Sequence, residues 1–133
     1  MESPLYKRVL LKLSGEILAG KKGFGIDPIK AVYLANEIKS LYEIGIRIGL
    51  IIGAGNIFRG IKASDQGMDR VTGDYLGMLA TIMNAISIQD ALEKIHCETR
   101  TLSAINVSQI SEPYIRRRAI RHMEKGRIVI IAG

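Results

Sequence analysis

The stretch RVLLKLSGE, residues 8–16, decides the fold class of this 133-residue chain. Its apolar residues on either side of Lys12 predict a short central strand, buried on both faces of a sheet. The strand is interrupted at Gly15, because glycine allows backbone conformations and close approaches that other residues resist. Lys12 is therefore predicted near the carboxyl end of a strand, where open α/β sheets bind ligands. A lysine beside a turn of small residues suits a phosphate, although an edge-strand lysine reaching into solvent explains the same pattern.

A second stretch, IRIGLIIGAGN at residues 46–56, repeats this arrangement. It predicts a strand over Ile48–Ile52 that ends in the turn Gly53–Asn56. Between the two strands, apolar periodicity predicts a helix over residues 28–43. Parallel strands joined by such a helical crossover end at the same edge of a sheet, so Lys12 and the second turn are expected to converge. This convergence favours the phosphate interpretation.

The rest of the chain continues the alternation of helices and strands. The patterns predict a helix from about Gly73, a strand over residues 99–105, a helix over Pro113–Lys125 and a strand from Ile128. The predicted fold class is α/β, with a mainly parallel sheet and helices on both faces in three layers. A helix is expected to follow the last strand, so the end at Gly133 is interpreted as a cut through the fold.

Composition limits the partners of the chain. A hydrophobic fraction of 47% with 24% charged residues indicates one globular domain. The net charge of +6 and pI near 9.6 favour anionic ligands. Arginines 116–118 would point in different directions on a helix, and aromatic residues make up 5% of the chain. Nucleic acid is therefore a less favoured partner, because base stacking needs aromatic side chains.

The number of cysteines and the length of the apolar runs indicate the cellular compartment and which metal sites are possible. Cys97 is the only cysteine, which excludes an internal disulfide and a cysteine-rich metal site, and no metal-ligating residues are predicted. The start of the chain lacks the apolar core of a signal peptide, and no apolar run approaches about 20 residues. These features predict a cytoplasmic protein with no membrane partner.

The two glycine turns restrict the chemistry. Neither matches the P-loop pattern, and GAGNIFRG does not have the spacing of the dinucleotide-binding fingerprint. Hydride transfer is therefore disfavoured. Phosphoryl transfer fits better, because it requires cations and backbone N–H groups around moving negative charge.

Five stretches resemble the amino-terminal part of bacterial UMP kinases, also called uridylate kinases, within the amino-acid kinase family. They are KRVLLKLSGE, GFGID, IIGAGNIFRG, DRVTGDYLGMLATIMNAISIQDAL and RRRAIRHMEKGRIVIIAG. Within them, GDYLGMLAT distinguishes UMP kinases from carbamate, acetylglutamate, glutamate and aspartate kinases. The resemblance implies that residues 1–133 are the UMP-side part of one kinase domain, without the carboxyl-terminal half that binds the ATP base. A chain of this extent is expected to be inactive alone.

The resemblance implies transfer of the γ-phosphoryl group of ATP, bound with Mg²⁺, to UMP, giving UDP and ADP in pyrimidine nucleotide biosynthesis. It assigns Lys12 as the catalytic residue that stabilises charge on the transferring group. The ATP and phosphate contacts that it implies are Lys12, Leu13, Ser14, Gly15, Gly55 and Arg59. The UMP contacts are Ala54 and Asp74. Ala54 replaces a glycine of the family pattern, and its methyl group is expected to matter only if the backbone there does not suit alanine.

The resemblance also implies a homo-oligomer, a hexamer, that is activated by GTP and inhibited by UTP. The implied allosteric positions are Gly20, Lys21, Lys22, Gly23, Phe24 and Gly25 in one loop, with Asp90, Arg100 and Arg127 elsewhere. Gln89 and Glu93 stand where some members have basic residues, which argues against GTP sensitivity.

Two other functions remain open from the sequence. One is another amino-acid kinase, with carbamate or an amino acid as the acceptor. The other is a basic, non-enzymatic module that binds nucleotides or nucleic acid, which salt-sensitive binding without competition by UMP would indicate.

Overall fold

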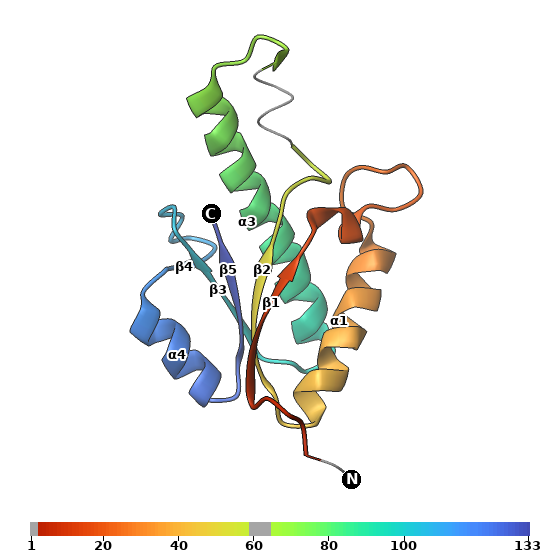
Figure 1. Cartoon of the computed structure of the whole chain (residues 1–133), viewed down its shortest axis with the longest axis vertical. Helices are drawn as coiled ribbons and strands as arrows, with labels where there is room; N and C mark the ends of the chain where they lie inside the picture. The colour runs from red at the N-terminus through yellow and green to blue at the C-terminus, as the bar shows by residue number, and fades with distance from the viewer. Residues whose placement is uncertain (1–2, 59–64) are drawn as a thin grey trace.

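The computed structural model describes residues 3–58 and 65–133 and contains one five-stranded sheet (Figure 1). Every strand pairing in the sheet is parallel, and the strand order is β1-β2-β5-β3-β4. The strands are β1 (Arg8–Leu13), β2 (Arg47–Ile52), β3 (Thr99–Ser103), β4 (Glu112–Pro113) and β5 (Ile128–Ala132). The predicted parallel α/β class is confirmed, and β5 lies between β2 and β3.

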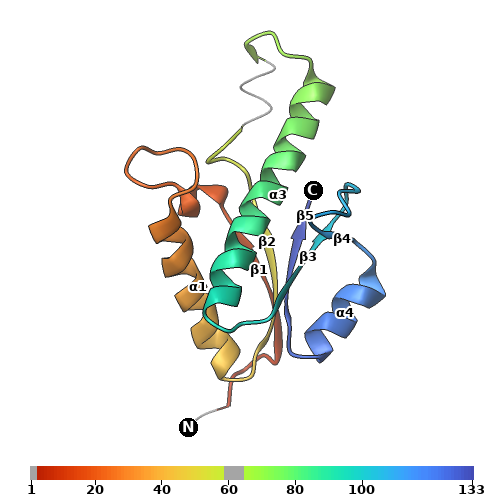
Figure 2. The ribbon, with the colours of Figure 1, turned by 180° about the vertical axis from the view of Figure 1, so that it is seen from behind.

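Helices cover both faces of the sheet, as expected for three layers. Helices α1 (Pro28–Glu43) and α3 (Arg70–Lys94) lie together on one face, and α4 (Arg116–Glu124) lies on the other (Figures 1 and 2). A 3₁₀ turn, η1 (Gly15–Leu18), follows β1 and was not predicted. Side chains of β5 pack on both faces of the sheet. Ile130 belongs to the core under α1 and α3, and Val129 packs with Ala119 of α4.

Strand β1 lies at the edge of the described sheet and pairs with β2 alone. Its burial alternates along the strand: Val9 and Leu11 pack against the core, whereas Leu10 is 61% exposed. The prediction of a central strand buried on both faces is therefore wrong. The physical reason is that α4 packs over β5 and β2 and leaves the same face of β1 uncovered. Lys12 consequently projects from an edge strand.

Helix α3 begins three residues before the predicted start at Gly73. Asp69 caps the helix, and its carboxylate accepts a hydrogen bond from the backbone N–H of Thr72 at 3.0 Å. Helix α1 keeps its predicted bounds, because Asp27 accepts the N–H of Ile29 at 2.9 Å.

The helix predicted over Pro113–Lys125 begins later in the structure, at Arg116. Residues Glu112–Pro113 pair with β3, and the N–H of Tyr114 donates to the Ser103 carbonyl at 2.9 Å. These bonds hold the segment extended, so α4 begins at Arg116. Strand β3 ends at Ser103 rather than at residue 105, because the Ser103 hydroxyl accepts the N–H of Ile105 and turns the chain.

Of the helices within residues 3–58 and 65–133, none combines the length and the apolar character that crossing a membrane requires. The arrangement that matters for the site is at the carboxyl ends of β1, β2 and β5. These ends meet at one edge, and the amino-terminal half of α3 projects beyond that edge (Figure 1).

Candidate active site

The carboxyl ends of β1 and β2 meet in register. Lys12 is paired with Ile51, and the Gly53 N–H donates to the Leu13 carbonyl at 2.9 Å. A cavity of about 760 Å³ opens at this edge; we call it the glycine cleft. Its lining residues are Lys12, Leu13, Ser14, Gly15, Glu16, Ile51, Ile52, Gly53, Gly55, Phe58 and Thr81. The predicted convergence of Lys12 with the second glycine turn is therefore observed.

Lys12 contributes the positive charge of the glycine cleft. Its side chain is exposed and projects from the face of β1 opposite α1. In the part of the chain that the structure describes, Lys12 forms no ion pair, whereas Lys39 and Lys94 each pair with a carboxylate one helical turn away. Its ammonium group can thus meet an anionic ligand without first breaking a salt bridge.

Ser14 and Gly15 form a tight junction between β1 and η1. The Ser14 hydroxyl oxygen accepts the N–H of Glu16 at 3.2 Å and caps the 3₁₀ turn. A Cβ atom on Gly15 would lie 2.5 Å from Oδ1 of Asn56 and closer still to the carbonyl oxygen of Gly53. Only glycine fits between these groups, so the turn after β1 packs directly on the turn after β2.

Ala54 is accommodated by the second turn. Among the described non-glycine residues, His96 alone has a positive φ, so Ala54 is outside the left-handed region that favours glycine. Its carbonyl accepts the N–H groups of Ile57 and Phe58, each at 2.9 Å. The condition under which alanine can replace glycine here is therefore met.

The structure does not bring every predicted UMP and phosphate contact into the glycine cleft. Asp74 is half-exposed on α3, and its carboxylate accepts a hydrogen bond from Nε of Arg70 at 3.1 Å. It precedes the lining residue Thr81 by seven positions, about 10 Å along a helix. Arg59 lies outside the described residues.

Thr81 and Asn84 were missed by the sequence analysis. The Thr81 hydroxyl accepts the N–H of Gly133 at 2.8 Å and links α3 to the end of β5. Asn84 is fully buried and bonds to the Gly53 carbonyl at 2.7 Å. The available signal was two polar residues three positions apart in an otherwise apolar helical stretch, which places both on one helix face.

The loop Gly20–Gly25, predicted to be allosteric, lies against the second glycine turn. Gly23 and Gly25 have φ values of 77° and 79°, which suit glycine, and Phe24 at the loop is 69% exposed. The N–H of Gly25 donates to the Asn56 carbonyl at 2.6 Å, and the Gly25 carbonyl accepts from Nδ2 of Asn56 at 2.9 Å. The loop is thus bonded to the cleft through one residue.

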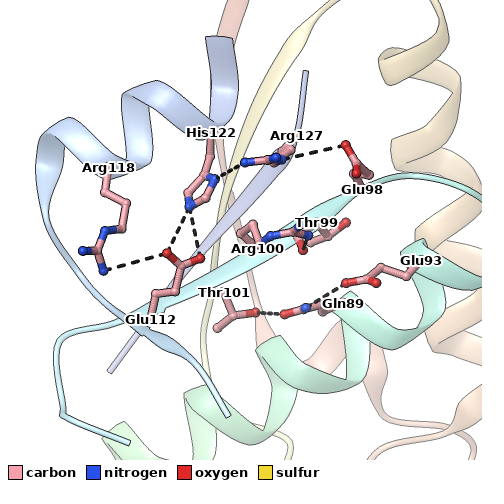
Figure 3. Close-up of polar contacts among 10 residues, drawn as sticks. All are labelled: Gln89, Glu93, Glu98, Thr99, Arg100, Thr101, Glu112, Arg118, His122 and Arg127. Atoms are coloured by element: carbon pink, nitrogen blue, oxygen red, sulfur yellow. Dashed lines mark hydrogen bonds and ion pairs between the residues drawn. The ribbon is translucent and has the colours of Figure 1, made fainter. Parts of the chain in front are cut away.

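The remaining predicted allosteric residues lie elsewhere. Asp90 pairs with Lys94 on the surface of α3 at 2.8 Å. Arg100 donates to the carbonyl of Thr99 at 2.9 Å, near Arg127 at the amino-terminal ends of β3 and β5 (Figure 3).

Arg127 belongs to a set of ionisable side chains that bond to one another, which we call the charged network. Its members are Glu98, Glu112, Arg118, His122 and Arg127. Arg127 lies 3.0 Å from Nδ1 of His122, and Nε2 of His122 lies 3.0 Å from the Glu112 carboxylate. Because a guanidinium group only donates, Nδ1 must accept and Nε2–H must donate. Both ring nitrogens are occupied, so His122 is not available as a base.

Comparison with known proteins identifies the class to which this fold and cleft belong. The model of the amino acid kinase family matches residues 7–133, and the chain belongs to that family. UMP kinase from Bacillus anthracis is 42% identical, with a TM-score of 0.89, over 96% of this chain and 52% of that chain. UMP kinase from Ureaplasma parvum is 31% identical, with a TM-score of 0.87, over 96% of this chain and 56% of that one. The resemblance to UMP kinases drawn from the motifs is therefore confirmed.

A more distant structure shares the fold alone. Aspartate kinase from Synechocystis is 15% identical, with a TM-score of 0.65, over 93% of this chain and 21% of that chain. The chain spans about half the length of the UMP kinase structures that it matches.

Proposed function

We propose that these residues form the amino-terminal, UMP-side part of a UMP kinase, which transfers the γ-phosphoryl group of MgATP to UMP. The observation that carries the proposal is the glycine cleft, where Lys12 and two glycine turns from neighbouring strands line one cavity. The choice of UMP as acceptor is supported by the 42% identity to a UMP kinase.

The proposed role of Lys12 follows from the chemistry of phosphoryl transfer. The protein contributes little covalent chemistry and acts mainly by positioning the reactants and stabilising negative charge. The backbone of Lys12 is held in β1 beside the cleft, so its ammonium group is close to the site where charge develops on the transferring group and can stabilise the transition state. Gly15 and Gly55 contribute close backbone approach to the phosphates, while Asp74 and Arg59 belong to the UMP side of the proposal.

Oligomerisation and GTP regulation are separate parts of the proposal. We propose that the amino-terminal half of α3, which projects beyond the sheet, meets a second copy of the chain, since Val71, Tyr75 and Leu79 there are 62%, 57% and 42% exposed. The GTP assignment has less support, because Asp90 and Arg127 are engaged with other side chains of this chain.

The test is a phosphoryl-transfer assay with UMP, CMP and carbamate as acceptors. It is run on two samples: the protein as the cell makes it, called the cellular protein below, and the 133-residue chain. The mass of the cellular protein is measured on the same sample. We expect selective, UMP-dependent ADP formation by the cellular protein and none by the 133-residue chain alone. Preference for carbamate would contradict the assignment of UMP. Salt-sensitive binding of nucleic acid with no transfer would favour the binding module.

A further inference from the structure

The side chains of Asn56 and Asn84 form a buried amide pair. Asn56 ends the glycine turn after β2 and is 2% exposed, while Asn84 lies within α3 and is 0% exposed. Each side chain donates one N–H to the other's Oδ1, at 3.0 and 2.8 Å. This reciprocal bonding fixes the orientation of both amides, because each has a donor and an acceptor engaged with the other.

The second N–H of each amide reaches a different backbone segment. Nδ2 of Asn84 donates to the Gly53 carbonyl at 2.7 Å, and Nδ2 of Asn56 donates to the Gly25 carbonyl at 2.9 Å. All four amide N–H groups are thereby used. The pair ties the phosphate turn to α3 on one side and to the loop Gly20–Gly25 on the other.

Asn84 is an unexpected residue for its position in α3. Asparagine is a weaker helix former than alanine or leucine, and a buried amide is costly unless it is fully hydrogen-bonded. Its neighbour Ala85 is equally buried and apolar. The bonds of Asn84 to Gly53 and Asn56 explain its presence, since both groups also lie against Gly15 in the cleft.

We infer that Asn84, acting with Asn56, is a positioning residue that holds the Gly53–Asn56 turn in the conformation that receives a phosphate group. The pair also couples that turn to the loop Gly20–Gly25. The inference rests on the proposed function, because it takes the glycine cleft as a phosphate site. Asn84 acts through the Gly53 carbonyl, whereas Gly55 and Thr81 line the cleft itself.

The experiment compares Asn84→Asp with Asn36→Asp in the 133-residue chain. Asn36 is a matched control, because its amide donates to the Val32 carbonyl on the exposed surface of α1, away from the glycine cleft. The backbone amide resonances of Gly25, Gly53 and Gly55 are recorded by NMR while inorganic pyrophosphate, and separately UMP, is added. The Ile130 amide, buried in β5, reports whether the fold is intact.

Asn84→Asp removes the N–H groups that bind Gly53 and Asn56. We expect the Gly25 resonance to move before any ligand is added, and pyrophosphate to bind about 10- to 100-fold more weakly, since the loss of one hydrogen bond to a charged group has an effect of this size. Asn36→Asp should change neither.

A second variant keeps the test valid if Asn84→Asp does not fold. Asn56→Leu/Asn84→Leu replaces both members of the pair with apolar side chains of similar shape, so no side-chain amide is left unpaired, while the Gly53 and Gly25 carbonyls lose their Asn donors. A folded double variant that binds pyrophosphate weakly supports a positioning role. Wild-type affinity in the folded double variant, or an unmoved Gly25 resonance in Asn84→Asp, overturns it.

The two ligands separate this inference from the proposed function. A wild-type chain that binds pyrophosphate but not UMP contradicts the UMP assignment, and the pyrophosphate data still decide the role of Asn84. A wild-type chain that binds neither ligand overturns both.

Discussion

The glycine cleft and the charged network are two polar regions that are built in opposite ways. Beside the glycine cleft, the buried polar groups are neutral amides and backbone atoms bonded to one another, and the exposed Lys12 forms no ion pair within residues 3–58 and 65–133. In the charged network, carboxylates, arginines and His122 pair with one another.

The difference fits the proposal that the glycine cleft binds a ligand and that the charged network is structural. Neutral amides can fix backbone geometry in a buried place without the large desolvation cost of a charge. The charge of Lys12 then remains available to a ligand. In the charged network, by contrast, Glu112 faces Arg118 and His122 of α4, so these contacts help to hold α4 against the sheet.

The largest effect is expected from Lys12→Met in the cellular protein. Removing a cation that stabilises transition-state charge should lower kcat about 100- to 1000-fold, with the melting temperature nearly unchanged because Lys12 is exposed. Lys30→Met, an exposed lysine on α1, is the control and should keep wild-type kcat. Steady-state kinetics and thermal unfolding measure both quantities. An unchanged kcat in Lys12→Met would mean that Lys12 of the glycine cleft does not take part in phosphoryl transfer.

The next effect is on stability and contrasts two glycines. Gly15→Ala should destabilise the chain by about 1–3 kcal/mol, because its Cβ would overlap Asn56 and Gly53. Gly77→Ala should stabilise it by about 0.5–1 kcal/mol, since that position lies in α3 and, among the described residues outside its own turn of helix, none lies within 4 Å of the new Cβ. Urea unfolding of the two variants gives the difference. Equal effects would mean that the cleft is loosely packed.

A smaller loss is expected in the charged network. Glu112→Gln keeps an oxygen to accept Nε2–H of His122 but removes the charge facing Arg118, 3.8 Å away. Because the Glu112 side chain is 35% exposed, the free energy of unfolding should fall by at most about 1 kcal/mol, and less at high salt. Urea unfolding at two salt concentrations measures this. If Glu112→Gln lowered the free energy of unfolding by more than Gly15→Ala does, the charged network would contribute more to stability than the packing at the glycine cleft, contrary to this account.

Cys97 is a buried thiol outside both the glycine cleft and the charged network, and it makes the stability of the fold depend on pH. Burial raises the pKa of the Cys97 thiol above its ordinary value of 9.0; Lys39 acts to lower it and Glu43 to raise it. The stability that the thiol contributes is therefore fully present below pH 9.0, and is lost as rising pH ionises it in the unfolded chain first. Unfolding experiments should show a decline above that pH that is smaller in Cys97→Ala. An identical decline in both proteins would contradict this assignment.

The smallest effect is expected from Ala54→Gly. The backbone of Ala54 is outside the left-handed region, so glycine relieves no strain and the UMP Michaelis constant should change little. Acceptor kinetics in the cellular protein test this. A large fall in that constant would mean that the alanine methyl group crowds the acceptor.

How far the sequence predicted the cleft depended on the range of each signal. Lys12, Gly15 and Gly53 were found because a strand followed by a glycine turn is a local pattern, and the parallel crossover brings such turns together. Asn84 was missed because its partners Gly53 and Asn56 are 31 and 28 positions away. A polar residue in an apolar helix does not reveal which backbone group it meets.

The edge position of β1 was also beyond local reasoning. Its apolar run suggests a central strand, but burial depends on where α4 packs, and Leu10 is left exposed. The early predicted start of the helix at Pro113 has the same origin. Pairing of Glu112 and Pro113 with Leu102 and Ser103 in β3 overrides the local helix pattern.

Hydrogen–deuterium exchange with UMP and a non-hydrolysable MgATP analogue tests the central claim most directly. It is measured on the cellular protein, and it compares residues 12–16 and 53–58 of the glycine cleft with residues 112–127 of the charged network. We expect the nucleotides to slow exchange in the cleft segments and to leave the network segment unchanged. Slowed exchange in the network with no change in the cleft would contradict the assignment of the glycine cleft as the phosphate site.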